Sequence, residues 1–80
     1  MHTQQLEFSE KWGLPLGQTL HALRTSRGMS LGETAKALHI SPRTLKRLEE
    51  GYIGPRLTTD VLFRAADLFQ VKASELFNQI

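Results

Sequence analysis

The sequence contains no cysteine, so neither a disulfide bond nor a thiolate metal site can stabilise the chain. It also lacks any apolar run that approaches the ~18 residues of a membrane span. Its N-terminal segment, MHTQQLEFSEKW, has neither the basic start nor the apolar block of a signal peptide. From these absences we expect a soluble, cytoplasmic protein with no membrane partner.

The residue groups that carry enzyme chemistry are absent as well. We find no pairing of a nucleophile with a base, no carboxylate pair and no phosphate-binding loop. The histidines His2, His21 and His39 are widely scattered, with neither cysteine nor nearby acids to complete a metal site. We therefore expect no metal, no cofactor and no enzymatic activity.

What the chain does have is a concentration of positive charge in its middle. The formal net charge is only +2, but residues 21–47 hold six cations and one acid, a net charge of +5. The segments 1–20, 48–56 and 57–80 each sum to −1. A basic middle between mildly acidic ends indicates a face directed at a polyanion, although chance clustering on a solvated surface would give the same sum.

From residue 16 onward, the spacing of apolar residues and the stop signals predict a small all-α domain. The expected helices span roughly residues 16–27, 30–38, 41–50, 59–69 and 73–79. Ser30 and Glu33 have the spacing of a capping box at the start of the second helix. Residues 1–13 are expected to form an N-terminal arm, and residues 14–80 the domain, which at 80 residues in all is a single one.

The segment HISPRTLKRLEEG, residues 39–51, predicts a helix with two different faces. Ser41 can cap it, and Pro42 fits the first helical position because its missing N–H costs nothing there. Leu45 and Leu48 form the side to be buried, and the cations at 43, 46 and 47 fall on the opposite side. A helix, a three-residue turn and this basic helix make a helix-turn-helix arrangement, whose second helix suits the major groove of DNA.

The run GMSLGETAKALHISPRTLKRLEEG resembles the phage-repressor and Cro type of helix-turn-helix domain, the XRE or lambda repressor-like family. The resemblance continues through Pro55, Leu57, RAADLFQV (64–71) and SELF (74–77), and so covers about residues 16–77. Over residues 24–51 the matching positions are Arg24, Gly28, Ser30, Glu33, Ala35, Leu38, Ile40, Ser41, Thr44, Leu45, Leu48, Glu49 and Gly51.

This resemblance implies an all-α, five-helix domain that regulates transcription, usually as a dimer on a partly palindromic operator in double-stranded DNA. Position by position, it assigns DNA contacts to Ser30, Leu31, Ser41, Pro42, Arg43, Thr44, Lys46, Arg47 and Arg56. It also implies that a salt bridge between Arg24 and Glu49 ties the first helix to the third.

The chain departs from the family pattern at three positions. Leu31 replaces a glutamine that usually binds phosphate, so any contact there comes from the backbone. His39 replaces the glycine that usually adopts a left-handed conformation in the turn, and Gln70 replaces a glycine before the last helix.

The chemistry of the side chains adds roles to the predicted contacts. Arg43 and Arg47 can each hold guanine O6 and N7 with two parallel hydrogen bonds, whereas Lys46 is better suited to phosphate. An alternative for each of them is that it simply points into solvent. Apolar residues late in the chain are expected to form core or the interface of a homodimer, and these are Phe69, Leu76, Phe77 and Ile80.

We therefore interpret the sequence as that of a nucleoid-associated, dimeric repressor or autoregulator that inserts helix 41–50 into the major groove. Two alternatives remain open at this point. One is an antitoxin that binds both its own promoter and a toxin or other protein partner, and the second is a helix-turn-helix module used only for protein contacts.

Overall fold

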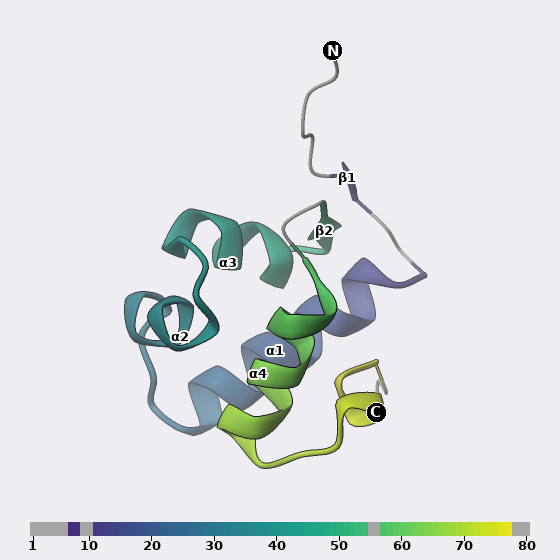
Figure 1. Ribbon diagram of the computed structural model, residues 1–80. Coiled ribbons are helices and arrows are strands. Elements are labelled where there is room, and N and C mark those ends of the chain that lie inside the picture. The colour runs from purple at the N-terminus through teal and green to yellow at the C-terminus, as the bar shows by residue number, and fades with distance from the viewer. Residues whose placement is uncertain (1–6, 9–10, 55–56, 78–80) are drawn as a thin grey trace.

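The structure is a computed structural model that describes residues 7–8, 11–54 and 57–77 (Figure 1). Its helices are α1 (Gly13–Ser26), α2 (Leu31–Leu38), α3 (Pro42–Glu49) and α4 (Thr59–Phe69), and a 3₁₀ helix η1 (Ala73–Phe77) follows. Two short strands, β1 (Glu7–Phe8) and β2 (Tyr52–Ile53), pair antiparallel, with Phe8 opposite Tyr52. None of the described helices is both long enough and apolar enough to span a membrane.

The architecture corrects the expected five α-helices in two respects. The described residues contain four α-helices, and the segment expected as a fifth, 73–79, forms a 3₁₀ helix of five residues instead. Its backbone is held by Glu75, which donates its N–H to the carbonyl of Lys72 and accepts the N–H of Lys72 at Oε1. Such a short piece with i to i+3 bonds is the usual form of a 3₁₀ helix.

The second correction concerns the N-terminal segment. α1 begins at Gly13, three residues before the predicted start and inside the segment expected to be an arm. The strand pair β1–β2 was not predicted, because two-residue strands are too short to show an alternating pattern. Most of the expected arm, residues 1–6 and 9–10, lies outside the described residues.

The predicted cap of α2 is confirmed, and α3 and α4 begin in the same way. Ser30 Oγ accepts the N–H of Glu33 at 3.0 Å, and Glu33 Oε1 accepts the N–H of Ser30 at 3.0 Å, which completes the capping box. Ser41 caps α3 and Thr58 caps α4, so each of these helices starts at a residue whose oxygen satisfies a free backbone N–H.

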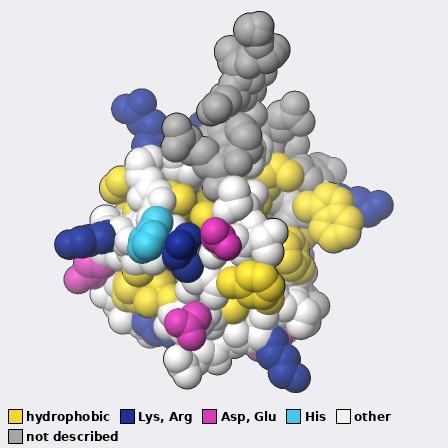
Figure 2. Space-filling view, in the orientation of Figure 1, with side chains coloured by type: hydrophobic (Ala, Val, Ile, Leu, Met, Phe, Trp, Pro, Cys, Tyr) yellow, Lys and Arg dark blue, Asp and Glu magenta, His cyan; other side chains and the backbone are white. Residues whose placement is uncertain are grey.

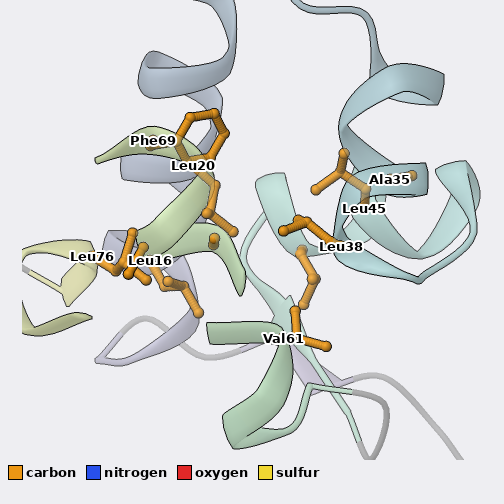
Figure 3. Packing of buried hydrophobic residues seen from close by; sticks show 11 residues of the cluster. Leu16, Leu20, Ala35, Leu38, Leu45, Val61, Phe69 and Leu76 are labelled. Atoms are coloured by element: carbon orange, nitrogen blue, oxygen red, sulfur yellow. The ribbon is translucent and has the colours of Figure 1, made fainter. Parts of the chain in front are cut away.

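The core lies between α4 and the other helices (Figure 3). Phe69 of α4 is fully buried and lies close to Leu20 of α1, while Val61, near the start of α4, is buried at the other end of the cluster (Figure 3). The same core holds Leu45 and Leu48 of α3, and it therefore fixes the inner face of the helix expected to bind DNA.

Two glycines let α1 approach the end of α3 closely. A β-carbon on Gly17 would overlap the carbonyl groups of Leu48 and Glu49, and one on Gly13 would overlap the carbonyl of Gly51. Both glycines are buried on one face of α1 because they are four residues apart. The C-terminal end of α3 is therefore held directly against the backbone of α1.

Candidate nucleic-acid interface

α3 separates its leucines from its cations. Leu45 and Leu48 are 0% and 2% exposed, whereas Arg43 and Lys46 are exposed and Arg47 is half-buried. The outer face of the helix forms a shallow hollow, lined by Arg43, Thr44, Lys46, Arg47 and Glu50. Lys and Arg side chains project at the upper left of Figure 2, the side on which Figure 1 places α3. The face is therefore basic, open and backed by a rigid apolar core.

The start of α3 is fixed by its own hydroxyl groups. Ser41 Oγ accepts the N–H of Thr44 at 3.1 Å and donates to Thr44 Oγ1 at 2.9 Å. The hydroxyl hydrogen of Thr44 can still be donated outward. Pro42 is exposed at the first helical position, where it offers only an apolar surface.

The start of α2 lies beside the same face but has fewer donors than the family pattern provides. The N–H of Ser30 is already bonded to Glu33 Oε1, so it is engaged within the capping box. Leu31 is half-buried against the core and Gly32 is exposed. Because the first N–H groups of a helix have no partners within it, the backbone at Leu31 and Gly32 provides the donors that a phosphate could use here.

A partly buried ionic cluster braces α3 against α1. Arg24 donates from Nε to Glu49 Oε2 at 2.6 Å and from Nη2 to Glu49 Oε1 at 3.0 Å, so the pair is bidentate. Arg24 Nη1 also donates to the carbonyl oxygen of Met29 at 2.9 Å, which adds the segment before α2. The guanidinium thus joins three parts of the chain around the helix-turn-helix unit.

Sequence reasoning missed a third member of this cluster, His21. Its Nδ1 lies 3.0 Å from Glu49 Oε1, a distance at which a protonated Nδ1 donates to the carboxylate. His21 is three residues before Arg24 on α1, so the two side chains share a face, and this spacing is the signal that could have revealed it.

The cluster changes the pKa values of both charged partners. Burial opposes the charge on Glu49 and by itself raises its pKa, but hydrogen bonds from Arg24 and His21 outweigh burial, so the pKa is lowered overall. The hydrogen bonds to Glu49 raise the pKa of Arg24, with burial acting in the opposite direction. Glu49 is therefore an ionised carboxylate at neutral pH.

Arg47 is held by two neighbours that the sequence did not reveal as partners. Its Cζ lies 4.1 Å from the centre of the Tyr52 ring, the geometry of a cation–π contact. Its Nη1 lies 3.5 Å from Glu50 Oε1, one turn along the helix. The guanidinium still reaches solvent, because the Arg47 side chain is 44% exposed.

Arg27 belongs to the basic segment but not to this face. It donates from Nη2 to the carbonyl oxygen of Phe69 at 2.8 Å, and its Cζ lies 5.4 Å from the centre of the Phe69 ring. Arg27 therefore closes the C-terminal end of α4, where cations are favourable. Not all of the six cations in residues 21–47 are therefore available on the outer face of α3.

The residues expected at a dimer interface fall into three groups. Phe69 and Leu76 are fully buried, so of the two places expected for them, core and dimer interface, they take the core of their own chain. Phe77 is 36% exposed and meets Trp12, which is 57% exposed, edge to face with ring centres 6.3 Å apart. Ile80, like Arg56 of the expected DNA contacts, lies outside the described residues.

Trp12 and Phe77 border a hollow that is almost entirely apolar. We call it the Trp12–Phe77 patch, and it is lined by Trp12, Leu16, Ile53, Leu57 and Phe77. Hydrophobic side chains are also visible over α4 and to the right of it in Figure 2. Among the side chains that the structure describes, no three His, Asp or Glu residues gather in a way that could hold a metal ion.

Comparisons with known proteins agree with this geometry. A family described as "Helix-turn-helix domain" matches residues 15–77, which is most of the chain. No curated protein matches the sequence. Among solved structures, the clp gene regulator ClgR from Corynebacterium glutamicum is 26% identical, with a TM-score of 0.68 over 78% of this chain and 64% of its own.

Two further solved structures show how widely the fold is used. An HTH_3 family transcriptional regulator from Vibrio cholerae is 30% identical, with a TM-score of 0.68 over 82% of this chain and 36% of its own. Hydroxypropylphosphonic acid epoxidase from S. wedmorenis is 24% identical, with a TM-score of 0.73 over 85% of this chain and 35% of its own, a likeness that shows the fold alone. The present chain spans less than two thirds of each of these three proteins.

The two short helices α2 and α3, their three-residue turn and the basic outer face define a small helix-turn-helix protein. Together with the family match, they show that the chain belongs to the helix-turn-helix family, in its XRE, lambda repressor-like type.

Proposed function

We propose that this protein binds double-stranded DNA sequence-specifically and acts as a dimeric transcriptional repressor or autoregulator. The observation that carries the proposal is the division of α3 into a buried leucine side and an open basic side. The structures named above as a gene regulator and a transcriptional regulator support the same function. A repressor requires only that its operator be occupied, which a helix-turn-helix protein can do by binding alone.

In this proposal α3 enters the major groove with its basic outer face toward the bases. Arg43 and Arg47 are the base-reading residues, because a guanidinium can bind O6 and N7 of a guanine in two parallel hydrogen bonds. Lys46 and the backbone N–H groups at the start of α2 bind phosphates, and so does the hydroxyl of Thr44, while Ser41 holds Thr44 in place by donating its own hydroxyl hydrogen to Thr44 Oγ1. Phosphate contacts make the binding sensitive to salt.

Dimerisation is proposed to use the Trp12–Phe77 patch. A small chain has a small core, so burying further apolar surface stabilises it. A second copy that covers the two partly exposed aromatic rings and the apolar hollow would remove this surface from water. The patch is formed mainly by α1, β2 and η1, so a second copy could bind there while the outer face of α3 stays open. Two α3 helices would then lie one turn of DNA apart, about 34 Å.

The proposal is tested by selecting duplexes from a random pool and measuring binding by gel shift. Arg43→Ala and Arg47→Ala are each expected to weaken binding to the selected duplex by about 1–3 kcal/mol, roughly 5- to 150-fold. Arg64→Ala on α4 is the matched control, since it removes the same charge from a half-buried side chain outside α3. Parental binding by both α3 variants would remove the assignment of α3 to the groove.

The antitoxin alternative shares this DNA-binding surface and adds a protein partner. It is distinguished by whether a second, different protein co-purifies in fixed stoichiometry with this chain from its native cell. A chain that purifies only with itself supports the repressor proposal over the antitoxin.

A further inference from the structure

We propose that Tyr52 is a positioning residue that holds the guanidinium of Arg47 ready to read a G·C base pair, with Glu50 fixing the edge of the guanidinium that faces the DNA. This inference rests on the proposed function and names a specificity determinant of the same surface. The role of Tyr52 concerns Arg47 alone and changes neither the proposed phosphate contacts nor the proposed docking of α3.

The Tyr52 ring lies against Cζ, the central atom of the Arg47 guanidinium, and not against Nη1, the donor that faces Glu50. The Cζ-to-centroid distance of 4.1 Å is that of two groups in van der Waals contact. The N–H groups of a guanidinium lie in its plane, so a ring on one face leaves them directed sideways. With the Arg47 side chain 44% exposed, the donors away from Glu50 remain open to the groove.

Tyr52 itself is held by the backbone around it. Gly51 is buried, has a φ of 106° and lets the chain turn sharply after α3, with its N–H bonded to the carbonyl of Leu48 at 3.1 Å. Tyr52 then enters β2, where Phe8 of β1 lies opposite. Since α1 also contacts Gly51 through Gly13, the ring has a fixed place relative to α3.

Glu50 adds direction to this arrangement. Its Oε1 is 3.5 Å from Arg47 Nη1, longer than a good hydrogen bond, so the pair orients the arginine without saturating its donors. A carboxylate at this point repels phosphate and disfavours the use of Arg47 as a backbone contact. In the major groove a G·C pair presents two acceptors on guanine and an amino donor on cytosine, and the Arg47 donors beside the Glu50 acceptor match that pattern.

The consequence is a stronger preference for one base pair, because the Arg47 side chain is already ordered before it binds DNA. A free arginine side chain must lose rotational freedom when it grips a base, and that loss weakens binding. An arginine already stacked on a fixed ring loses less, which is the general effect of preorganisation. The benefit should appear at the base pair read by Arg47 and nowhere else in the site.

The test uses the full chain, the duplex selected by the parent, and variants of that duplex at each base pair. The pair read by Arg47 is the one whose substitution no longer matters in Arg47→Ala. Tyr52→Leu is expected to reduce the preference for that pair about three- to tenfold, with the salt dependence unchanged. Tyr52→Phe keeps the ring and should keep the preference, and Tyr52→Leu should have no further effect on it in an Arg47→Ala background.

Phe63→Leu is the matched control, because Phe63 is an exposed aromatic on α4 and the same replacement there should leave the preference unchanged. A second measurement needs no DNA: NMR of the parent should show the Arg47 Cδ protons shifted upfield by the Tyr52 ring. Their ordinary position would overturn the stack even if Tyr52→Leu failed to fold.

Different failures point to different conclusions. Equal weakening of all duplexes by Tyr52→Leu would make Tyr52 structural, and a loss in Tyr52→Phe as large as that in Tyr52→Leu would make its hydroxyl the relevant group. Either result overturns the positioning role while the proposed function stands. If the parent selects no duplex at all, the proposed function fails, and this inference fails with it.

Discussion

Among the described residues, two that carry a β-carbon end helices in the left-handed region. His39 has φ 62° and ψ 38° after α2, and Gln70 has φ 60° and ψ 45° after α4. For a residue other than glycine this conformation costs roughly 1–2 kcal/mol. His39 is the first residue of the turn between α2 and α3. The angle between these helices is therefore maintained although the backbone of His39 is strained.

We predict that His39→Gly stabilises the protein by about 0.5–1 kcal/mol, which is the relief of strain less the greater freedom of glycine in the unfolded chain. The free energy of unfolding from chemical denaturation measures this directly. His39→Ala is the control, because alanine keeps the β-carbon and should give no gain. A gain for alanine equal to that for glycine would place the cause in the side chain of His39 and not in its backbone.

At the scale of the element, α3 is fixed by three independent means. Its inner face is packed by Leu45 and Leu48, its start is capped by Ser41, and its end is held through Glu49. The glycine pair of α1 brings the backbones close enough for the Arg24–Glu49 pair to be short and partly buried. In the proposed function α3 has to keep its angle to the duplex, and this brace holds α3 at a fixed angle to the rest of the chain.

We predict that Glu49→Gln lowers the free energy of unfolding by about 2 kcal/mol at neutral pH, since hydrogen bonds to charged groups are lost. The pKa of Glu49 is lowered on folding, so its contribution is present above the usual pKa of a glutamate and is lost as pH falls through the folded value. Chemical denaturation at neutral pH and at acid pH should therefore show that the difference in unfolding free energy between parent and variant becomes smaller in acid.

Glu50→Gln provides the control for this pH effect, because Glu50 is the adjacent carboxylate but its side chain is 42% exposed. Its replacement should change stability by no more than about 0.5 kcal/mol at either pH. A gap for Glu49→Gln that stayed constant into acid would contradict the role of the ionised carboxylate.

The elements with strong local signals could be predicted from the sequence. Ser30 with Glu33, and Ser41 with Pro42, fix the starts of α2 and α3 through short-range hydrogen bonds, and α4 spans the predicted 59–69. The start of α1 was wrong by three residues, because Pro15 fits anywhere in a first turn and does not mark which position it occupies.

The parts that could not be predicted depend on contacts between distant segments. Arg27 donates a hydrogen bond to the carbonyl of Phe69, 42 residues away, and no local sequence pattern predicts such a partner. Arg47 lies in α3 and Tyr52 follows the helix, so their contact forms only because the positive φ of Gly51 turns the chain between them. The sequence left open whether Phe69 and Leu76 belong to the core or to an interface, because an apolar side chain suits both equally well, and in the structure both are buried in the core.

Across the whole molecule, the basic face of α3 and the Trp12–Phe77 patch involve different elements. The hollow on α3 is lined by charged and polar side chains, whereas the patch is lined by apolar ones from α1, β2, η1 and the segment before α4. DNA binding and self-association can therefore take place on one small chain without competing for the same side chains.

We predict that Phe77→Asp shifts the protein from dimer to monomer, because a charge placed in the apolar patch must be desolvated to form the interface. Sedimentation equilibrium would measure the shift, and binding to a duplex with two half-sites should weaken at least tenfold. Phe63→Asp, on an exposed part of α4, is the control and should leave the dimer intact. A monomeric parent at micromolar concentration would contradict the proposed interface.

The most direct test of the proposed placement of α3 in the major groove is an NMR titration of the protein with its selected duplex. The largest changes in backbone amide signals should fall on residues 41–50 and on the start of α2, with the outer side of α4 unaffected. Changes concentrated on α4 and η1, with the signals of α3 unmoved, would contradict the placement of α3 in the groove.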